Sequence, residues 1–351
     1  MSKLKIGIIG VGNIAETHIA AYLKNPNVEL YAFCDINPER LKAMSEKYGV
    51  TRTFTDKDEL LSIKEIDAVS VCTWNSAHAP CTIAALNAGK HVLCEKPMAM
   101  SSAEAAEMKA AADRNGKLLM IGFVRRYGDD CATLKEMIDS NYLGEIYYTK
   151  ANYLRRNGNP GGWFGDKSRS GGGPLIDLGV HVIDLVRYLL GNPKPISAYG
   201  VTFHKLGNRN ELKDRKGYYS ASATDADQCD VEDMVSALVR FDNGAVLDVE
   251  ASFSLNIKSD VGKIELFGDK GGAKIDPDLE MYTVVNGRMA DVSLSSKVGF
   301  GDFFGKEINH FVDCVQNGTT CIAPAADGVE IMKILDAIYE SARTGHEVVI
   351  Q

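Results

Sequence analysis

The first 122 residues alternate between short apolar runs and segments of helical periodicity, and this alternation constrains the fold more than any other feature. The runs are Ile6–Ile9, Glu29–Cys34, Ala68–Cys72, His91–Cys94 and Leu118–Ile121, and the helical segments are Ala15–Lys24, Pro38–Tyr48, Ala79–Ala88 and Ala103–Arg114. Largely apolar strands joined by helices are typical of a parallel sheet that is covered on both faces. We therefore predict a doubly wound, Rossmann-type α/β domain over residues 1–122.

The pattern changes in the remaining residues, 123–351. Strand patterns dominate between residues 195 and 294, and helical patterns cover Ile176–Leu190, Phe304–Gln316 and Gly328–Thr344. A run of strands after an α/β half predicts a second domain of the α+β type, with a mostly antiparallel sheet. We expect the polar segment 205–228 to form an exposed loop.

Charge and hydropathy exclude several classes of partner. The net charge is -8, which disfavours a broad basic surface for nucleic acid and offers no polybasic patch for a membrane. No apolar run approaches the length of a membrane span. The glycine-rich motif begins at Gly10, which leaves no room for a secretory signal, so we expect a cytoplasmic protein.

The cysteines show no metal-binding spacing. They lie at positions 34, 72, 81, 94, 131, 229, 314 and 321, and no two of them form a C-x-x-C pair. Several lie in apolar, strand-like runs, so buried reduced thiols in a reducing compartment are the interpretation that we favour. We expect no metal site.

The first chemical motif is Gly10-Val-Gly12-Asn13-Ile14-Ala15, which follows a predicted strand and opens a predicted helix. It matches G-x-G-x-x-G/A, in which the first glycine permits a tight turn and the second lets the backbone approach a pyrophosphate. The free N–H groups of the helix N-terminus then face the phosphates. We predict dinucleotide binding here, with Asn13 and Ile14 among the cofactor contacts.

Two residues bear on the choice of cofactor. Asp35 ends the second predicted strand, 20 residues beyond Ala15, where a carboxylate can accept hydrogen bonds from ribose hydroxyls and repels a 2′-phosphate. This favours NAD over NADP. Arg40 lies five residues further on and either reaches a phosphate or is a solvated helix residue, so NADP stays the alternative.

The candidate catalytic residues lie in both halves. Glu95-Lys96-Pro97 follows a predicted strand, and the carboxyl ends of strands are where an open α/β sheet binds ligands. In the second half, Asp177 and His181 are spaced i, i+4 and would share one helix face after a glycine run that starts at Gly171. A lysine, an aspartate and a histidine can together manage the proton that accompanies hydride transfer.

These motifs, in this order, resemble the glucose–fructose oxidoreductase / inositol dehydrogenase / rhizopine catabolism (Gfo/Idh/MocA) family. The resemblance rests on the N-terminal glycine motif, on Glu95-Lys96-Pro97 and on the Gly-Gly-Gly-x-x-x-Asp-x-Gly-x-His-x-x-Asp run at 171–184. It covers nearly the whole chain and implies a C-terminal domain whose large open sheet mediates oligomerisation. We therefore expect a homodimer or a homotetramer.

The resemblance also implies roles for individual residues. Lys96 would contact the reacting hydroxyl and the nicotinamide, beside Glu95, and His181 would accept or donate the proton. Asp177 would bind substrate hydroxyls and orient the histidine. The stretch Thr73, Asn75 and His78 is similar to the family's T-P-N-x-x-H segment near the cofactor, although Trp74 replaces the usual proline.

Two more residues near the glycine run have alternative interpretations. Arg155 and Trp163 either grip and stack on a sugar in a pocket or belong to a solvated loop with a packed tryptophan. We assign a structural role to Asp184.

Together, the motifs predict an NAD(P)-dependent oxidoreductase that transfers a hydride between nicotinamide and a secondary hydroxyl of a sugar, cyclic polyol, anhydrosugar or glycoside. One alternative is a redox-neutral conversion in which tightly held NAD oxidises and later re-reduces one substrate. Another is a non-catalytic, NAD-sensing regulator, which predicts a degraded lysine or histidine motif; here both are intact.

Overall fold

The computed structural model describes residues 3–209, 212, 218–220, 222–224, 227, 229–295 and 298–351. The chain divides into two compact units: residues 1–124 with 304–332, and residues 125–303 with 333–351. The first division lies close to the predicted boundary at residue 122. Residues 304–332 belong to the first unit, whereas the sequence predicted one domain for all residues after 122. The helix in this segment packs against the first unit.

The first unit contains a six-stranded sheet in the order β3-β2-β1-β4-β5-β6, with every pair parallel. Its strands are β1 (Leu4–Ile9), β2 (Val28–Cys34), β3 (Thr53–Phe54), β4 (Ala68–Val71), β5 (His91–Glu95) and β6 (Leu119–Gly122). This is the predicted doubly wound Rossmann arrangement, with ligand-binding turns at the carboxyl ends of its strands. The short β3 is one element that the apolar periodicity did not indicate.

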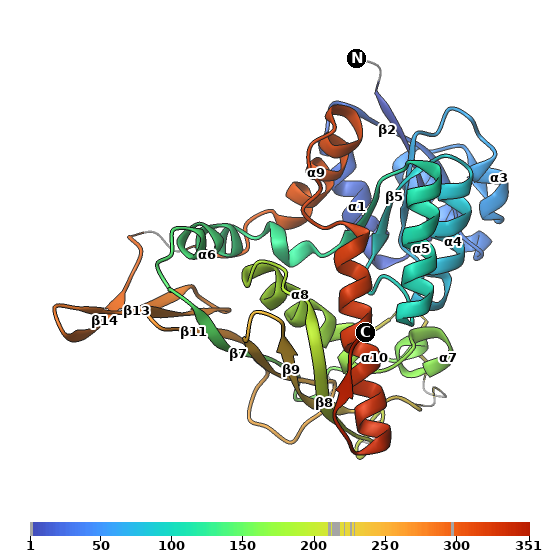
Figure 1. Cartoon of the computed structure of the whole chain (residues 1–351). Coiled ribbons are helices and arrows are strands. Elements are labelled where there is room, and N and C mark those ends of the chain that lie inside the picture. Colours follow the sequence, from blue (N-terminus) through green and yellow to red (C-terminus); the bar gives the residue numbers. More distant parts are fainter. Residues whose placement is uncertain are drawn as a thin grey trace. The chain divides into compact units, whose positions relative to one another are not determined.

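Helices connect these strands and bury their apolar side chains. They are α1 (Asn13–Lys24), α2 (Pro38–Tyr48), α3 (Lys57–Leu61), α4 (Asn75–Asn87) and α5 (Ser102–Asn115), and α4 packs against α5 (Figure 1). The late helix α9 (Phe303–Asn317) joins this unit beside α1, where the Asn25 side chain donates a hydrogen bond to Asn309 at 2.8 Å. Every residue of β4 is buried, as expected for a strand covered on both faces.

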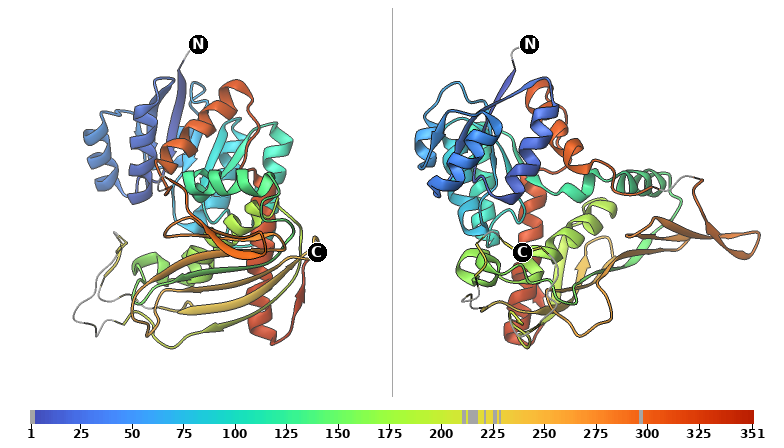
Figure 2. Two further views of the ribbon diagram at one scale, coloured as in Figure 1. Left: turned by 90° about the vertical axis from the view of Figure 1, so that its left-hand side faces the viewer. Right: turned by 180° about the vertical axis from the view of Figure 1, so that it is seen from behind.

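The second unit contains a nine-stranded sheet in the order β14-β13-β12-β11-β7-β10-β9-β8-β15. Its strands are β7 (Ile146–Leu154), β8 (Pro195–Phe203), β9 (Met234–Phe241), β10 (Val246–Ser252), β11 (Val261–Gly268), β12 (Gly271–Ile275), β13 (Glu280–Val285), β14 (Arg288–Val292) and β15 (Val348–Val349). All neighbours are antiparallel except β7 and β10, so the predicted mostly antiparallel sheet is confirmed. Figure 2 shows these strands as one curved sheet.

Helices of this unit are α6 (Asp129–Asp139), α7 (Lys167–Ser170) and α8 (Val180–Leu189), while α10 (Ala325–Thr344) begins in the first unit and ends in the second. The helix α8 packs against β7 and β10. A buried ion pair holds α8 in place: the Arg126 guanidinium donates to both oxygens of Asp184, at 2.6 and 3.0 Å. Both side chains are almost fully buried, which agrees with the structural role that we assigned to Asp184.

Among the described residues, no helix combines the length and the apolar character needed to cross a membrane. Of the eight cysteines, six are buried and two, Cys229 and Cys321, are half-buried. The segment 205–228 lies partly outside the described residues.

Candidate active site

The glycine turn at the end of β1 fits a nucleotide closely. Gly10 has a φ of +83°, a conformation that side chains rarely adopt, and an added Cβ would lie 2.8 Å from the backbone carbonyl of Cys72. The turns after β1 and β4 are therefore in direct contact. Since β1 lies between β2 and β4, this edge is the point at which strand order reverses, the usual ligand crevice of such sheets.

Gly12 is the N-cap residue of α1, and no side chain caps the first turn of that helix. The N–H groups of a helix N-terminus and its dipole attract anions such as phosphate. Asn13 is exposed and Ile14 is half-buried at this turn. A Cβ at Gly10 would collide with the Cys72 backbone, whereas one at Gly12 would meet only Arg40 Nη1, at 3.5 Å, so the backbone at Gly12 is open to the approach of a dinucleotide.

Asp35 lies directly beside this glycine turn. One of its carboxylate oxygens accepts a hydrogen bond from the Val11 N–H at 2.8 Å, and the other accepts one from the Asn37 N–H at 2.8 Å. The side chain is half-buried. Asp35 thus fixes the glycine turn and places a negative charge at the end of β2, where the adenosine ribose binds in folds of this kind.

Arg40 reaches the same turn. An added Cβ on Gly12 would lie 3.5 Å from its Nη1 atom, and the side chain is half-buried on α2. The guanidinium therefore lies beside the backbone of the glycine turn, and its contact with a phosphate stays a prediction. A carboxylate, Asp35, and a guanidinium, Arg40, thus both lie at the glycine turn.

The Glu95-Lys96-Pro97 turn follows β5, and hydrogen bonds of the buried Glu95 side chain hold it in place. The Glu95 carboxylate is buried; its Oε1 accepts a hydrogen bond from His18 Nε2 at 2.8 Å, and its Oε2 accepts one from the Lys96 N–H at 3.1 Å. Lys96 is half-buried, and the Lys96–Pro97 peptide bond is cis. Glu95, predicted as a cofactor contact, thus orients the backbone that carries Lys96.

His18 extends this anchor through the core. It is fully buried on α1, its Nδ1 lies 3.4 Å from the Ser70 hydroxyl, and that hydroxyl lies 2.8 Å from the Tyr22 hydroxyl. Burial opposes ionisation of Glu95, but the hydrogen bond and charge of His18 lower its pKa below the ordinary value. Sequence reasoning missed His18; a histidine on an apolar helix face, ten residues before β2 begins, carries no signal of a partner 77 residues away.

A second buried carboxyl group lies near the first. Glu307 on α9 is fully buried, and among the described residues neither of its carboxyl oxygens has a hydrogen-bond partner. Burial and the negative charge of Glu95 raise the pKa of Glu307 well above its ordinary value. The pKa values of the two carboxyl groups are thus shifted in opposite directions, an arrangement that sequence reasoning also missed.

The stretch after β4 is tied to the lysine turn. His78 is 1% exposed, and its two ring nitrogens lie 2.7 Å from the Pro97 carbonyl and 3.1 Å from the Thr73 carbonyl. Burial lowers the pKa of His78 below its ordinary value, while the two backbone carbonyls, which can only accept hydrogen bonds, act in the opposite direction. Asn75 is likewise buried, whereas Thr73 is half-buried. His78 thus joins the turns that follow β4 and β5, and its predicted contact with the cofactor stays a prediction.

In the second unit, Asp177 lies within a π-helical turn, Leu175–Gly179, that runs directly into α8. Such turns are rare and frequently occur at functional sites. Asp177 is 9% exposed, while His181 in the first turn of α8 is half-buried among buried neighbours. His181 is therefore more accessible than a core histidine, and Asp177 shares its short helical segment.

The glycine run before this segment is held by Glu232, which sequence reasoning did not select. The Glu232 carboxylate accepts hydrogen bonds from the N–H groups of Gly173 at 2.9 Å and Leu175 at 3.2 Å, and from the Tyr339 hydroxyl at 2.9 Å. A Cβ on Gly172 would lie 2.1 Å from that hydroxyl. The glycines thus allow the backbone to approach Glu232 and Tyr339, which fixes where the turn with Asp177 begins.

Arg155 and Trp163 lie on loops of the same unit. The Arg155 guanidinium donates to the Gly158 carbonyl at 3.0 Å and lies over the Tyr153 ring, and Trp163 stacks on Phe164 with 3.9 Å between ring centroids. Both side chains are half-buried. These contacts order the loop and leave substrate binding by either residue a proposal.

The geometry defines a Rossmann-type sheet with a glycine turn suited to a dinucleotide, and comparison with known proteins supplies the class and family of the chain. Residues 4–123 match the model of the oxidoreductase family with an NAD-binding Rossmann fold, and residues 135–350 match its C-terminal alpha/beta domain. The chain belongs to the Gfo/Idh/MocA oxidoreductase family, as the motifs predicted.

Its relatives act on sugars and polyols. It is 36% identical to D-glucoside 3-dehydrogenase of Escherichia coli (strain K12), over 99% of this chain and 97% of the relative, and 28% identical to myo-inositol 2-dehydrogenase of Thermotoga maritima, over 93% and 92%. Levoglucosan dehydrogenase in complex with NADH superimposes with a TM-score of 0.87 at 25% identity, and the match covers 100% of both chains.

The buried Glu307 generates a prediction about stability. The folded protein keeps a proton on this group that the unfolded chain releases near the ordinary pKa of 4.5. The unfolded state therefore binds fewer protons, and the group's contribution to the unfolding free energy falls as pH rises from 4.5 towards the elevated folded pKa. The slope approaches about 1.4 kcal/mol per pH unit.

We expect Glu307→Gln to remove this slope, so that the variant gains stability relative to the wild type as pH rises. Urea unfolding of both proteins between about pH 5 and pH 8 measures the difference. The exposed Glu107→Gln is the matched control and should parallel the wild type. Parallel curves for Glu307→Gln and the wild type would contradict a buried, protonated Glu307.

Proposed function

We propose that this protein catalyses NAD-dependent oxidation of a secondary hydroxyl on a glycoside or a related pyranose, and that the reaction is reversible. The observation that carries the substrate class is the 36% identity to D-glucoside 3-dehydrogenase across 99% of the chain. The intact lysine, aspartate and histidine of the candidate site support catalysis over a purely sensing role. The absence of disulfides among eight free cysteines supports a reducing location, and we propose the cytoplasm.

NAD, held by the glycine turn, the N-terminus of α1 and Asp35, supplies the acceptor for the hydride. We propose that Lys96 donates a hydrogen bond to the reacting hydroxyl and stabilises its developing negative charge. His181 then accepts the hydroxyl proton, since an imidazole suits proton transfer near neutral pH. Asp177 binds substrate hydroxyls and orients the histidine.

A substrate panel tests the activity directly. Glycosides, free hexoses, inositols and anhydrosugars are each incubated with NAD, and NADH absorbance is followed. Accumulation of free NADH with pyranosides supports the proposal. Conversion of substrate without free NADH would favour the redox-neutral alternative, and no conversion of any class would overturn the proposal.

The catalytic roles predict how variants divide between turnover and binding. Lys96→Ala and His181→Ala should each lower kcat by roughly 100- to 10,000-fold, the usual contribution of general acid–base groups, because both act most strongly in the transition state. NADH binding, measured by fluorescence titration, should persist. Asp177→Asn should affect KM more than kcat.

Matched controls are available in the same units. Lys109→Ala on α5 removes a half-buried lysine that pairs with Asp113, and His204→Ala removes an exposed histidine; both should leave kcat near that of the wild type. Circular dichroism verifies folding. Folded Lys96→Ala and His181→Ala proteins with near-normal kcat would show that other residues carry the chemistry.

The proposed preference for NAD predicts how kcat/KM differs between the two cofactors. The wild type should have a higher kcat/KM with NAD, because unit charges about 4 Å apart near a protein surface repel by roughly 4 kcal/mol. Asp35→Ser should narrow or reverse the preference by about tenfold or more, with Arg40 then available to the 2′-phosphate. Asp35→Asn separates charge from shape, since it keeps an acceptor for the Val11 N–H. Equal kcat/KM with NAD and NADP in the wild type would show that Asp35 does not set the cofactor preference.

We also propose that the second unit forms a homodimer or a homotetramer through its sheet. Tyr199 on β8 and Leu238 on β9 are paired across the strands, and each is 45% exposed on the face opposite the buried Ala198 and Val239. Exposed apolar groups on a broad sheet mark an interaction surface. Light scattering should show an oligomer, and Leu238→Lys should weaken it. A wild-type monomer across micromolar concentrations would refute the proposal.

A further inference from the structure

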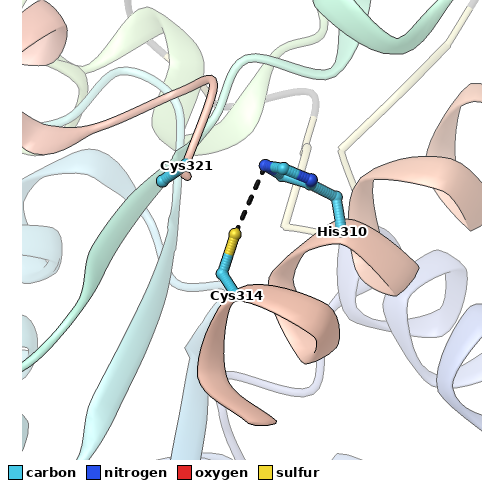
Figure 3. Close-up of side chains that lie close together, drawn as sticks. All are labelled: His310, Cys314 and Cys321. Atoms are coloured by element: carbon cyan, nitrogen blue, oxygen red, sulfur yellow. Dashed lines mark hydrogen bonds between the residues drawn. The ribbon is translucent and has the colours of Figure 1, made fainter. Parts of the chain in front are cut away.

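A cluster of sulfur and nitrogen ligands lies in the first unit, apart from the residues assigned to catalysis. It consists of His310 and Cys314 on α9 and Cys321 on the segment that follows (Figure 3). His310 Nε2 lies 3.3 Å from Cys314 Sγ, and one ligand atom from each of the three residues lies within 4.8 Å of the others. We call this group the His-Cys-Cys cluster.

Local structure brings these residues together. His310 and Cys314 are four residues apart on one helix face. The helix α9 ends at Asn317, and Gly318, with a φ of +71°, returns an N–H bond to the Cys314 carbonyl at 3.1 Å. This left-handed end turns the chain back over the last turn of the helix, so that Cys321 faces Cys314.

The returning segment is fixed at several points. The Asp313 carboxylate accepts hydrogen bonds from the Asn317 amide at 2.6 Å and from the Thr319 hydroxyl. Further on, the Ala323 carbonyl accepts a bond from the Ile121 N–H of β6 at 3.0 Å. The cluster is therefore held between a helix and a segment bonded to the central sheet, and a ligand that binds it has little chain to order.

We propose that the His-Cys-Cys cluster binds one thiophilic divalent cation, with zinc as the best match. Zinc takes cysteine sulfur at about 2.3 Å and histidine nitrogen at about 2.0–2.1 Å in a tetrahedron, which separates ligand atoms by about 3.5–3.8 Å. In the cluster one pair of ligand atoms lies 3.3 Å apart and none is more than 4.8 Å from another, so small side-chain movements would bring them to these separations. Three protein ligands leave a fourth position for water.

Burial and hydrogen bonding determine how a metal ion would reach the cluster and which bond it would replace. Cys314 is 8% exposed, whereas His310 and Cys321 are half-buried, so the ion can enter from the surface. The Ile322 N–H donates to His310 Nε2 at 3.2 Å, and a metal ion would replace that long bond with coordination. The bound ion would join the end of α9 to the segment that leads into α10.

The spacing explains why the sequence predicted no metal site. The ligands follow an H-x3-C-x6-C pattern, and no C-x-x-C pair marks it. Only the reversal of the chain after Asn317 brings the third ligand to the other two.

Cobalt titration tests the proposal without any measurement of activity. The full-length protein, reduced and freed of metal with a chelator, is titrated with Co²⁺, whose bonds to thiolates give charge-transfer absorption and whose tetrahedral sites give intense visible bands. We expect saturation at one equivalent, displacement by Zn²⁺, and a higher melting temperature with Zn²⁺. No thiolate–cobalt absorption at micromolar protein and metal would overturn the proposal.

Variants assign the site to its ligands. Cys314→Ser, Cys321→Ser and His310→Gln should each weaken binding by more than the roughly 10- to 100-fold that loss of an outer-shell partner produces. Cys229→Ser is the matched control, because Cys229 is the other half-buried cysteine and lies in the second unit. Unchanged cobalt binding by Cys314→Ser and Cys321→Ser would refute this assignment, as would loss of binding in Cys229→Ser.

Discussion

Parallel pairing of the strands in the first unit is the constraint on which the candidate site depends. Because all six strands run the same way, their carboxyl ends meet at one edge of the sheet. Gly10, Asp35, Thr73 and Lys96 each follow a strand of this sheet, so residues from four separate turns converge there. The contact between Gly10 and the Cys72 carbonyl requires glycine at the turn, whereas Gly12, with only Arg40 near its missing Cβ, leaves the backbone open on that side.

Charges buried beneath this edge decide how its turns are oriented. A buried carboxylate is costly unless it is paired and hydrogen-bonded. Glu95 meets that condition through His18 and the Lys96 N–H, so the backbone that carries the lysine cannot rotate without exposing a buried charge to an apolar core. Glu307 meets the cost differently, by keeping its proton. The same carboxyl chemistry thus yields one fixed charge and one neutral group within a single core.

The second unit uses a buried carboxyl group for a similar purpose. Glu232 accepts hydrogen bonds from the N–H groups of Gly173 and Leu175, at the start of the helical segment that carries Asp177. The glycine run lets the backbone come close enough for those bonds to form. The Arg126–Asp184 pair fixes the following helix from its other side. Asp177 and His181 therefore lie on a segment that is held at both ends, which limits the conformations available to two groups whose positions must suit proton transfer.

The sequence alone determined the features that depend on neighbouring residues. Apolar periodicity predicted most strands and helices, and the glycine motif predicted a tight turn after the first strand; the structure confirms both. The order of the motifs predicted the family and its NAD-binding fold, which the comparisons confirm. The catalytic roles of Lys96, Asp177 and His181 rest on those motifs and stay predictions. Tertiary structure alone decided the contacts between residues that are distant in the chain. The His18–Glu95 bond spans 77 residues and the Glu232–Gly173 bond spans 59, and the third ligand of the His-Cys-Cys cluster depends on a chain reversal. Periodicity and turn signals arise within a few residues, whereas such partners are selected by packing, which no local pattern encodes.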